Sequence, residues 1–173
     1  MRGWLVNDRL TAIPGVCTLW HHLLEALPGL ESRCTGTYQG LAHTTNMAAK
    51  VEKPDYIIRN AAYFQPLEVE APVISFVQDI LDGYMRDLLI DACAASRLVV
   101  FNSEYTRAAY PELHSADYRI IPIGTDSTIF EPHDVEPTNA VLWVGSGHPV
   151  KGFDLACKLA LESKRPWIFV MKD

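Results

Sequence analysis

Short apolar runs alternate with segments of helical periodicity along most of the chain. The apolar runs end in polar residues, which is typical of strands buried on both faces of a sheet. We predict strands at residues 2–6, 54–60, 71–79, 97–101 and 117–123, and helices at 16–27, 83–95 and 104–113. Strands that alternate with helices predict a parallel sheet covered by helices on both faces.

The first helix has the clearest pattern. Apolar side chains recur at three- and four-residue spacings from Val16 to Leu27, and Pro28-Gly29 then stops the helix. The helix at 104–113 has a predicted N-cap in Ser103, whose hydroxyl can accept from the free amides of the first turn.

A second α/β segment follows a polar stretch. Residues 131–139 contain two prolines and no periodicity, so we place an interdomain linker at 133–139, after a first domain at 1–132. A strand at 140–144, a helix at 153–163 and a strand at 167–171 then predict the first βαβ unit of an incomplete second domain at 140–173.

Composition narrows the class of protein. The 173 residues fit one full domain plus an extra piece, and a hydrophobic fraction of 49% can fill a core. A net charge of −6 argues against a nucleic-acid partner. No apolar run approaches the roughly 20 residues that span a bilayer, and the N-terminus turns polar at Asn7-Asp8, too soon for a signal peptide. We predict a cytoplasmic protein without a transmembrane segment.

The metal-ligating residue types are scattered. The four cysteines, Cys17, Cys34, Cys93 and Cys157, have no ligand spacing and are interpreted as buried, reduced thiols. His21 and His22 are neighbours on a helix and point in different directions. We therefore predict no metal site.

Ligands of parallel α/β sheets bind at the carboxyl ends of the strands. The loop from Gly145 to Gly152 joins a strand to a helix and carries Lys151, so it suits a phosphate, although a simple turn with an exposed lysine has the same composition. It lacks the Gly-Lys-Ser/Thr order of a Walker loop. Gly15, at the start of the first helix, either lets a ligand approach the backbone or only makes the turn.

Three segments in this order resemble the retaining nucleotide-sugar glycosyltransferases of the family 4 type, which have two Rossmann-like domains facing across a cleft (the GT-B fold). They are Ala95–Ser103, similar to the family's strand ending in serine; Ile120-Ile-Pro-Ile-Gly-Thr-Asp126 with Phe130-Glu-Pro132, similar to its domain crossing; and Val144-Gly145 with Lys151-Gly152, similar to its phosphate loop. The resemblance covers nearly the whole chain. It implies an N-terminal acceptor-side domain and the start of a donor-binding domain.

The resemblance also implies roles for particular residues. The donor diphosphate would be bound by Gly15, Gly145, Ser146 and Lys151; the catalytic positions would be Gln78 and Asp79; acceptor-side candidates are Asn60, Tyr63 and Tyr84. A nucleotide-diphosphate sugar would be the co-substrate, with no metal or other cofactor. The acceptor would be a glycan, a lipid or a small molecule, and peripheral membrane contact is compatible with this assignment.

The sequence departs from the family in several places. Ser146 stands where the family has an arginine, Gln78-Asp79 where many members have a histidine, and Pro122 near the usual asparagine. The chain ends before the family's glutamate pair, so we expect a fragment that has no transferase activity alone and a stub sheet prone to association. Acceptor choice would fall to variable loops such as 30–53, which contain no interpretable motif.

Two other classes of protein share some of these sequence features. A Rossmann oxidoreductase requires a G-x-G-x-x-G fingerprint after the first strand, which residues 6–15 do not supply. A non-catalytic nucleotide- or glycan-binding module remains compatible with the sequence.

Overall fold

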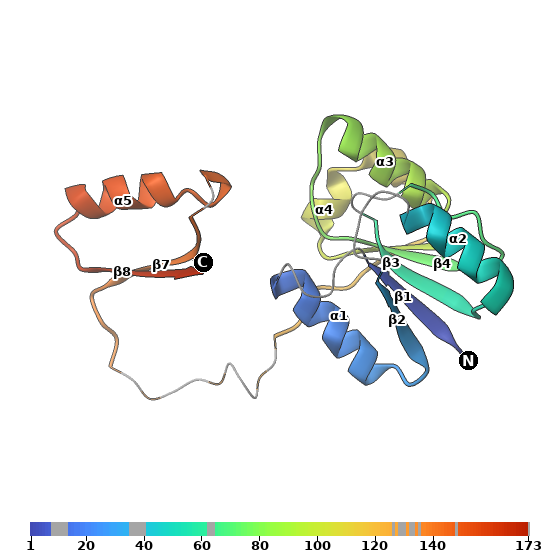
Figure 1. Cartoon of the computed structure of the whole chain (residues 1–173). Helices are drawn as coiled ribbons and strands as arrows, with labels where there is room; N and C mark the ends of the chain where they lie inside the picture. The colour runs from blue at the N-terminus through green and yellow to red at the C-terminus, as the bar shows by residue number, and fades with distance from the viewer. Residues whose placement is uncertain are drawn as a thin grey trace. The chain divides into compact units, whose positions relative to one another are not determined.

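The computed structural model describes residues 1–7, 14–34, 41–61, 65–125, 127, 131, 134, 136–147 and 149–172. The chain forms two compact units, Met1–Thr125 and Asp126–Asp173 (Figure 1).

A parallel sheet forms the centre of the first unit. Its strands are β1 (Gly3–Asn7), β2 (Leu30–Cys34), β3 (Tyr56–Asn60), β4 (Val73–Val77), β5 (Leu98–Phe101) and β6 (Tyr118–Ile120). They lie in the order β2-β1-β3-β4-β5-β6, and every neighbouring pair is parallel. The predicted α/β class with a Rossmann-like parallel sheet is confirmed.

Helices cover both faces of this sheet, as the alternating pattern predicted. On one face, Trp20 of α1 (Pro14–Ala26) packs with Leu5 and Ile58 and meets the ring of Phe76 edge-on at 5.5 Å. On the other face, α2 (Leu41–Glu52) contributes Ala49 to a cluster around strands β1 and β3. The same face carries α3 (Gly83–Ala94), whose buried side chains pack on β4 and β5.

The interpretation of residues 30–53 as variable loops is wrong, because this range contains β2 and α2. The edge strand β2 has no apolar run because it contains the charged residues Glu31 and Arg33, which form ion pairs. Glu31 accepts from Arg2 Nε at 2.9 Å and pairs with Arg33 at 3.2 Å, and both arginines also reach Glu52 of α2. Ion pairs between neighbouring elements therefore replace the hydrophobic pattern that identifies the central strands.

Several predicted elements are shorter in the structure, among them a helix and an edge strand. The helix at 104–113 is divided into α4 (Glu104–Ala108) and a 3-10 turn, η1 (Pro111–Leu113), because the proline cannot donate the amide that would continue an α-helix. The strand at 117–123 is limited to the three residues of β6.

The second unit is a single βαβ unit. Its elements are β7 (Val141–Ser146), a 3-10 turn η2 (Pro149–Lys151), α5 (Phe153–Glu162) and β8 (Trp167–Lys172), with parallel strands. Four aromatic rings on these elements form a connected cluster, Trp143, Phe153, Trp167 and Phe169, with ring centroids 5.0 to 6.1 Å apart. The alternate strand positions Leu142, Val144, Ile168 and Val170 are exposed.

Candidate functional site

The strand order of the first sheet reverses between β1 and β3. The strand β2 lies on one side of β1, and β3 and the later strands lie on the other side. In sheets of this type, ligands bind beyond the carboxyl ends of the strands at such a reversal. Here β1 ends at Asn7 and β3 ends at Asn60. Tyr63, an acceptor-side candidate, belongs to a segment outside the described residues. Residues 8–13, which follow β1, also lie outside them.

Asn60 and its neighbour Arg59 are buried at the end of β3. Their exposed fractions are 7% and 1%. Arg59 Nη1 donates to the carbonyl of Gln65 at 2.8 Å, which connects β3 to the segment that leads into β4. Burial lowers the pKa of Arg59 to about 10, so the guanidinium stays charged at neutral pH. A buried cation thus lies beside the sheet's reversal point, and Asn60 is part of the strand rather than of an open loop.

The loop after β4 carries Gln78 and Asp79. The Gln78 side chain is partly buried, and its Nε2 atom is shielded from solvent without a hydrogen-bond partner in the described part of the chain. Asp79 is exposed. The carbonyl of Gln78 accepts from Asn102 Nδ2 at 3.1 Å, and that of Asp79 accepts from the Tyr110 hydroxyl at 2.9 Å. The two catalytic candidates therefore lie at the carboxyl end of β4. Their backbone carbonyls accept hydrogen bonds from the side chains of Asn102 and Tyr110.

Polar side chains also gather where β5 leads into α4. Ser103 is the N-cap of α4 and its Oγ accepts from the Thr106 amide at 3.1 Å, which confirms the predicted cap. Thr106 Oγ1 donates to Asn102 Oδ1 at 2.6 Å. Asn102 was visible in the sequence only as a polar residue directly after a strand. Its bond to Gln78 depends on the parallel pairing of β4 with β5.

Tyr84 lies in the first turn of α3 and is 70% exposed. It follows Gly83, whose φ of +51° places it in the left-handed region. The open ring suits stacking on the apolar face of a ligand.

In the second unit, Gly145 and Ser146 end β7, and Lys151 ends η2 directly before α5. A Cβ atom built on Gly145 would be 2.9 Å from the Trp143 ring and 3.5 Å from Lys151 Cβ, so the strand end and the lysine lie against each other. Lys151 is exposed. Gly152 is the N-cap of α5 with a φ of +66° and has no side chain to satisfy the first amides of the helix.

The charges at the start of α5 have opposite signs. Lys151 precedes the helix, and Asp154 lies in its first turn, where a carboxylate complements the positive end of the helix dipole. An anion bound at these amides would therefore meet one cation and one carboxylate. The structure thus brings together Gly145, Ser146 and Lys151, whereas Gly15 lies in the first unit, in the first turn of α1.

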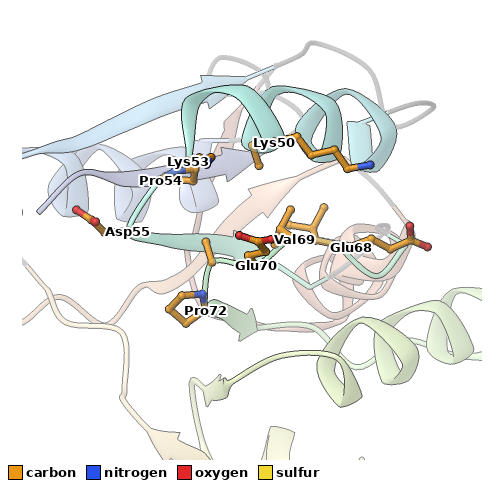
Figure 2. Close-up of a pocket in the computed structure, with 11 residues that line it drawn as sticks. Lys50, Lys53, Pro54, Asp55, Glu68, Val69, Glu70 and Pro72 are labelled. Carbon is orange, nitrogen blue, oxygen red and sulfur yellow. The ribbon is translucent and has the colours of Figure 1, made fainter.

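A cavity of about 770 Å³ lies at the opposite ends of the strands of the first sheet, away from their carboxyl ends (Figure 2). It is lined by the end of α2 and by residues just before β3 and β4, among them Lys50, Lys53, Asp55 and Glu70. These are the amino ends of the strands, away from the edge that binds ligands in folds of this class. Among the sequence-predicted site residues that the structure describes, none lines this cavity.

The described residues contain no group of three or more His, Cys, Asp or Glu side chains that could hold a metal ion. Within the same residues, no helix is both long and apolar enough to span a bilayer. Burial raises the pKa of the Cys93 thiol to about 12, so this thiol is protonated and unreactive at neutral pH.

Comparison with protein-family models, with curated proteins and with solved structures finds no match to this chain. The topology of the first sheet defines the class, an α/β protein with a Rossmann-like parallel sheet.

Proposed function

We propose that this chain belongs to a retaining glycosyltransferase that uses a nucleotide-diphosphate sugar. The observation that carries the proposal is the loop from β7 to α5, where Gly145 lies against Lys151 and the first turn of α5 lacks a side-chain cap. Free helical amides beside a lysine suit a diphosphate, whose oxygens are anionic acceptors.

Lys151 has the central role in this proposal. Negative charge grows on the diphosphate oxygen as the bond to the transferred sugar breaks, and a fixed cation stabilises that charge more in the transition state than in the ground state. No metal ion is required when a lysine does this. Gly145 and Ser146 add backbone contacts, and Gly15 is the corresponding candidate in the first unit.

The first unit supplies the catalytic candidates and the acceptor-side candidates. Gln78 and Asp79 lie at the carboxyl end of β4, where a ligand of a parallel sheet is expected, and an amide and a carboxylate are suitable partners for sugar hydroxyls. Asn60, Tyr63 and Tyr84 are the candidates for acceptor contacts. A glycan, a lipid or a small molecule would be the acceptor.

A cytoplasmic location is part of the same proposal. It is supported by the free thiols of Cys93 and Cys157, because secreted proteins usually oxidise such residues.

The proposal is tested by calorimetry on the purified chain with UDP-glucose and GDP-mannose. Lys151→Ala removes the proposed diphosphate contact and should weaken binding about 10- to 100-fold, the usual value of a charge-assisted hydrogen bond. The matched control is Lys158→Ala, which removes an equal exposed charge from α5 and should bind like the wild type.

Other outcomes would point to different functions. Preferential binding of NAD would favour an oxidoreductase. Donor binding without turnover, also in a protein that contains a complete donor-binding domain, would favour a non-catalytic binding module. An equal loss in the two lysine variants would contradict the role of Lys151.

A further inference from the structure

The backbone of residues 77–81 is held by side chains and backbone groups that come from beyond β5. The carbonyl of Val77 accepts from the Asn102 amide at 3.3 Å and that of Gln78 from Asn102 Nδ2. The carbonyl of Asp79 accepts from the Tyr110 hydroxyl at 2.9 Å, and the same hydroxyl accepts from the Leu81 amide at 2.9 Å. Three consecutive carbonyls, one at the end of β4 and two in the loop that follows, are therefore hydrogen-bonded.

Tyr110 makes two of these bonds from a fixed position. Its side chain is fully buried in the cluster that includes Val77, Leu89 and Phe101. Arg86 lies over its ring at 5.2 Å and also donates to the Ala109 carbonyl at 3.1 Å. Burial raises the pKa of Tyr110, so its hydroxyl remains a donor throughout the physiological pH range.

The side chains of the loop contrast with its backbone. Gln78 Nε2 is shielded from solvent and has no partner in the described part of the chain, although buried donors are normally bonded. Asp79 is exposed. A rigid backbone that carries a shielded donor without a partner among the described residues, next to an open carboxylate, resembles a preorganised ligand contact rather than a mobile connection.

We propose that Tyr110 is a positioning residue, which holds the loop 78–81 in the conformation in which Gln78 and Asp79 contact the hydroxyl groups of a bound sugar. This role rests on the proposed function. Tyr110 acts through the loop backbone and does not itself touch the ligand. Asn102 supports the same conformation from β5.

The test uses Tyr110→Phe, which removes the hydroxyl and keeps the ring in its cluster. The matched control is Tyr118→Phe, because Tyr118 packs on Phe101 in the same cluster and its hydroxyl has no partner among the described residues. Asn102→Asp is a second variant, which loses the amide donor to Gln78 and keeps the acceptor of Thr106. Each variant is compared with the wild type at a temperature where all are folded.

The first measurement is hydrogen exchange at the Leu81 amide in the free protein. Tyr110→Phe should accelerate it about tenfold, because one hydrogen bond holds this amide closed. The Val99 amide, which donates to the backbone carbonyl of Asp117 beside the sheet, reports the global change in stability. An increase at Leu81 no larger than that at Val99 would overturn the proposal, as would an equal effect of Tyr118→Phe.

The second measurement follows the Gln78 side-chain amide resonances during titration with UDP-glucose. The wild type and Tyr118→Phe should show the same shift and affinity, whereas Tyr110→Phe and Asn102→Asp should bind at least several-fold more weakly. Faster exchange at Leu81 with unchanged binding would overturn the ligand role. If the wild type binds neither UDP-glucose nor GDP-mannose, the proposed function fails with the ligand role, and the exchange data alone decide whether Tyr110 holds the loop.

Discussion

Gly145 lies so close to the ring of Trp143 that a Cβ atom at this position would be 2.9 Å from the indole. The ring has little room to move away, because it also packs against Phe153 and Phe169 with centroids 5.0 and 6.1 Å distant. The close approach of the strand end to the aromatic cluster therefore depends on the absence of a side chain at residue 145. The same approach brings the strand end to Lys151.

This contact predicts that Gly145→Ala destabilises the second unit by about 1–3 kcal/mol, the usual cost of overpacking. Gly147→Ala is the control, since a Cβ atom there would meet nothing within 4 Å. Tryptophan fluorescence during urea unfolding measures both. Equal stability of the two variants would show that the Trp143 contact does not constrain the loop.

The ion pairs around β2 predict a pH dependence. The hydrogen bond from Arg2 holds the pKa of Glu31 below its ordinary value of 4.5. A carboxylate with a lowered folded-state pKa contributes stability above its unfolded pKa and loses it as the pH falls through the folded value. Glu31→Gln should therefore be less stable than the wild type at neutral pH, and the difference should close below about pH 4.5.

The control for Glu31 is Glu70→Gln, at an exposed carboxylate without an ion pair among the described residues. Thermal unfolding between pH 3 and pH 7 compares the variants, at pH values chosen to bracket the ordinary carboxylate range of about 4. A difference between wild type and Glu31→Gln that persists unchanged at the acid end would contradict the assignment.

The N-cap of α4 predicts a moderate effect. Ser103→Ala removes the acceptor of the Thr106 amide and should cost about 1 kcal/mol. Ser115→Ala, at an exposed residue beyond η1, should change the free energy of unfolding by less than about 0.5 kcal/mol. Chemical denaturation separates the two, and an equal cost would mean that the cap bond does not contribute.

The exposed apolar positions on β7 and β8 predict self-association. Val144 is 65% exposed and Ile168 is 50% exposed on adjacent strands. Replacing both with lysine should shift the chain towards the monomer in sedimentation experiments, because charge on a sheet face opposes contact between copies. Leu161→Lys, at an 88% exposed helical position, is the control. Association that is insensitive to the strand variants would place the contact elsewhere.

The central strands were predictable because burial on both faces leaves continuous apolar runs, as in β4 and β5. The strand β2 and the helix α2 were not, because Glu31 and Arg33 reach stability through ion pairs that have no periodic signature. The helix at 104–113 was extended through Pro111, although a proline lacks the required amide.

The candidate site likewise contains residues that the sequence could predict and contacts that it could not. Gln78 and Asp79 were recognisable as polar residues after a strand. Gly145 and Lys151 were recognisable from the strand-to-helix segment that carries them. The contact of Tyr110 with the loop joins residues about 30 positions apart and arises only from packing of the segment after α4 against β4 and α3. Sequence patterns identify which loops carry polar groups, whereas the fixed conformation of a loop depends on distant side chains.

The most direct test of the central claim is a titration of the ¹⁵N-labelled chain with UDP-glucose and GDP-mannose, followed at the backbone amides. We predict that the amides of Gly147 and of the first turn of α5 shift, and that Lys151→Ala suppresses the shift while Lys158→Ala does not. Shifts confined to the cavity around Lys50 and Glu70, or no shift with either compound, would contradict it.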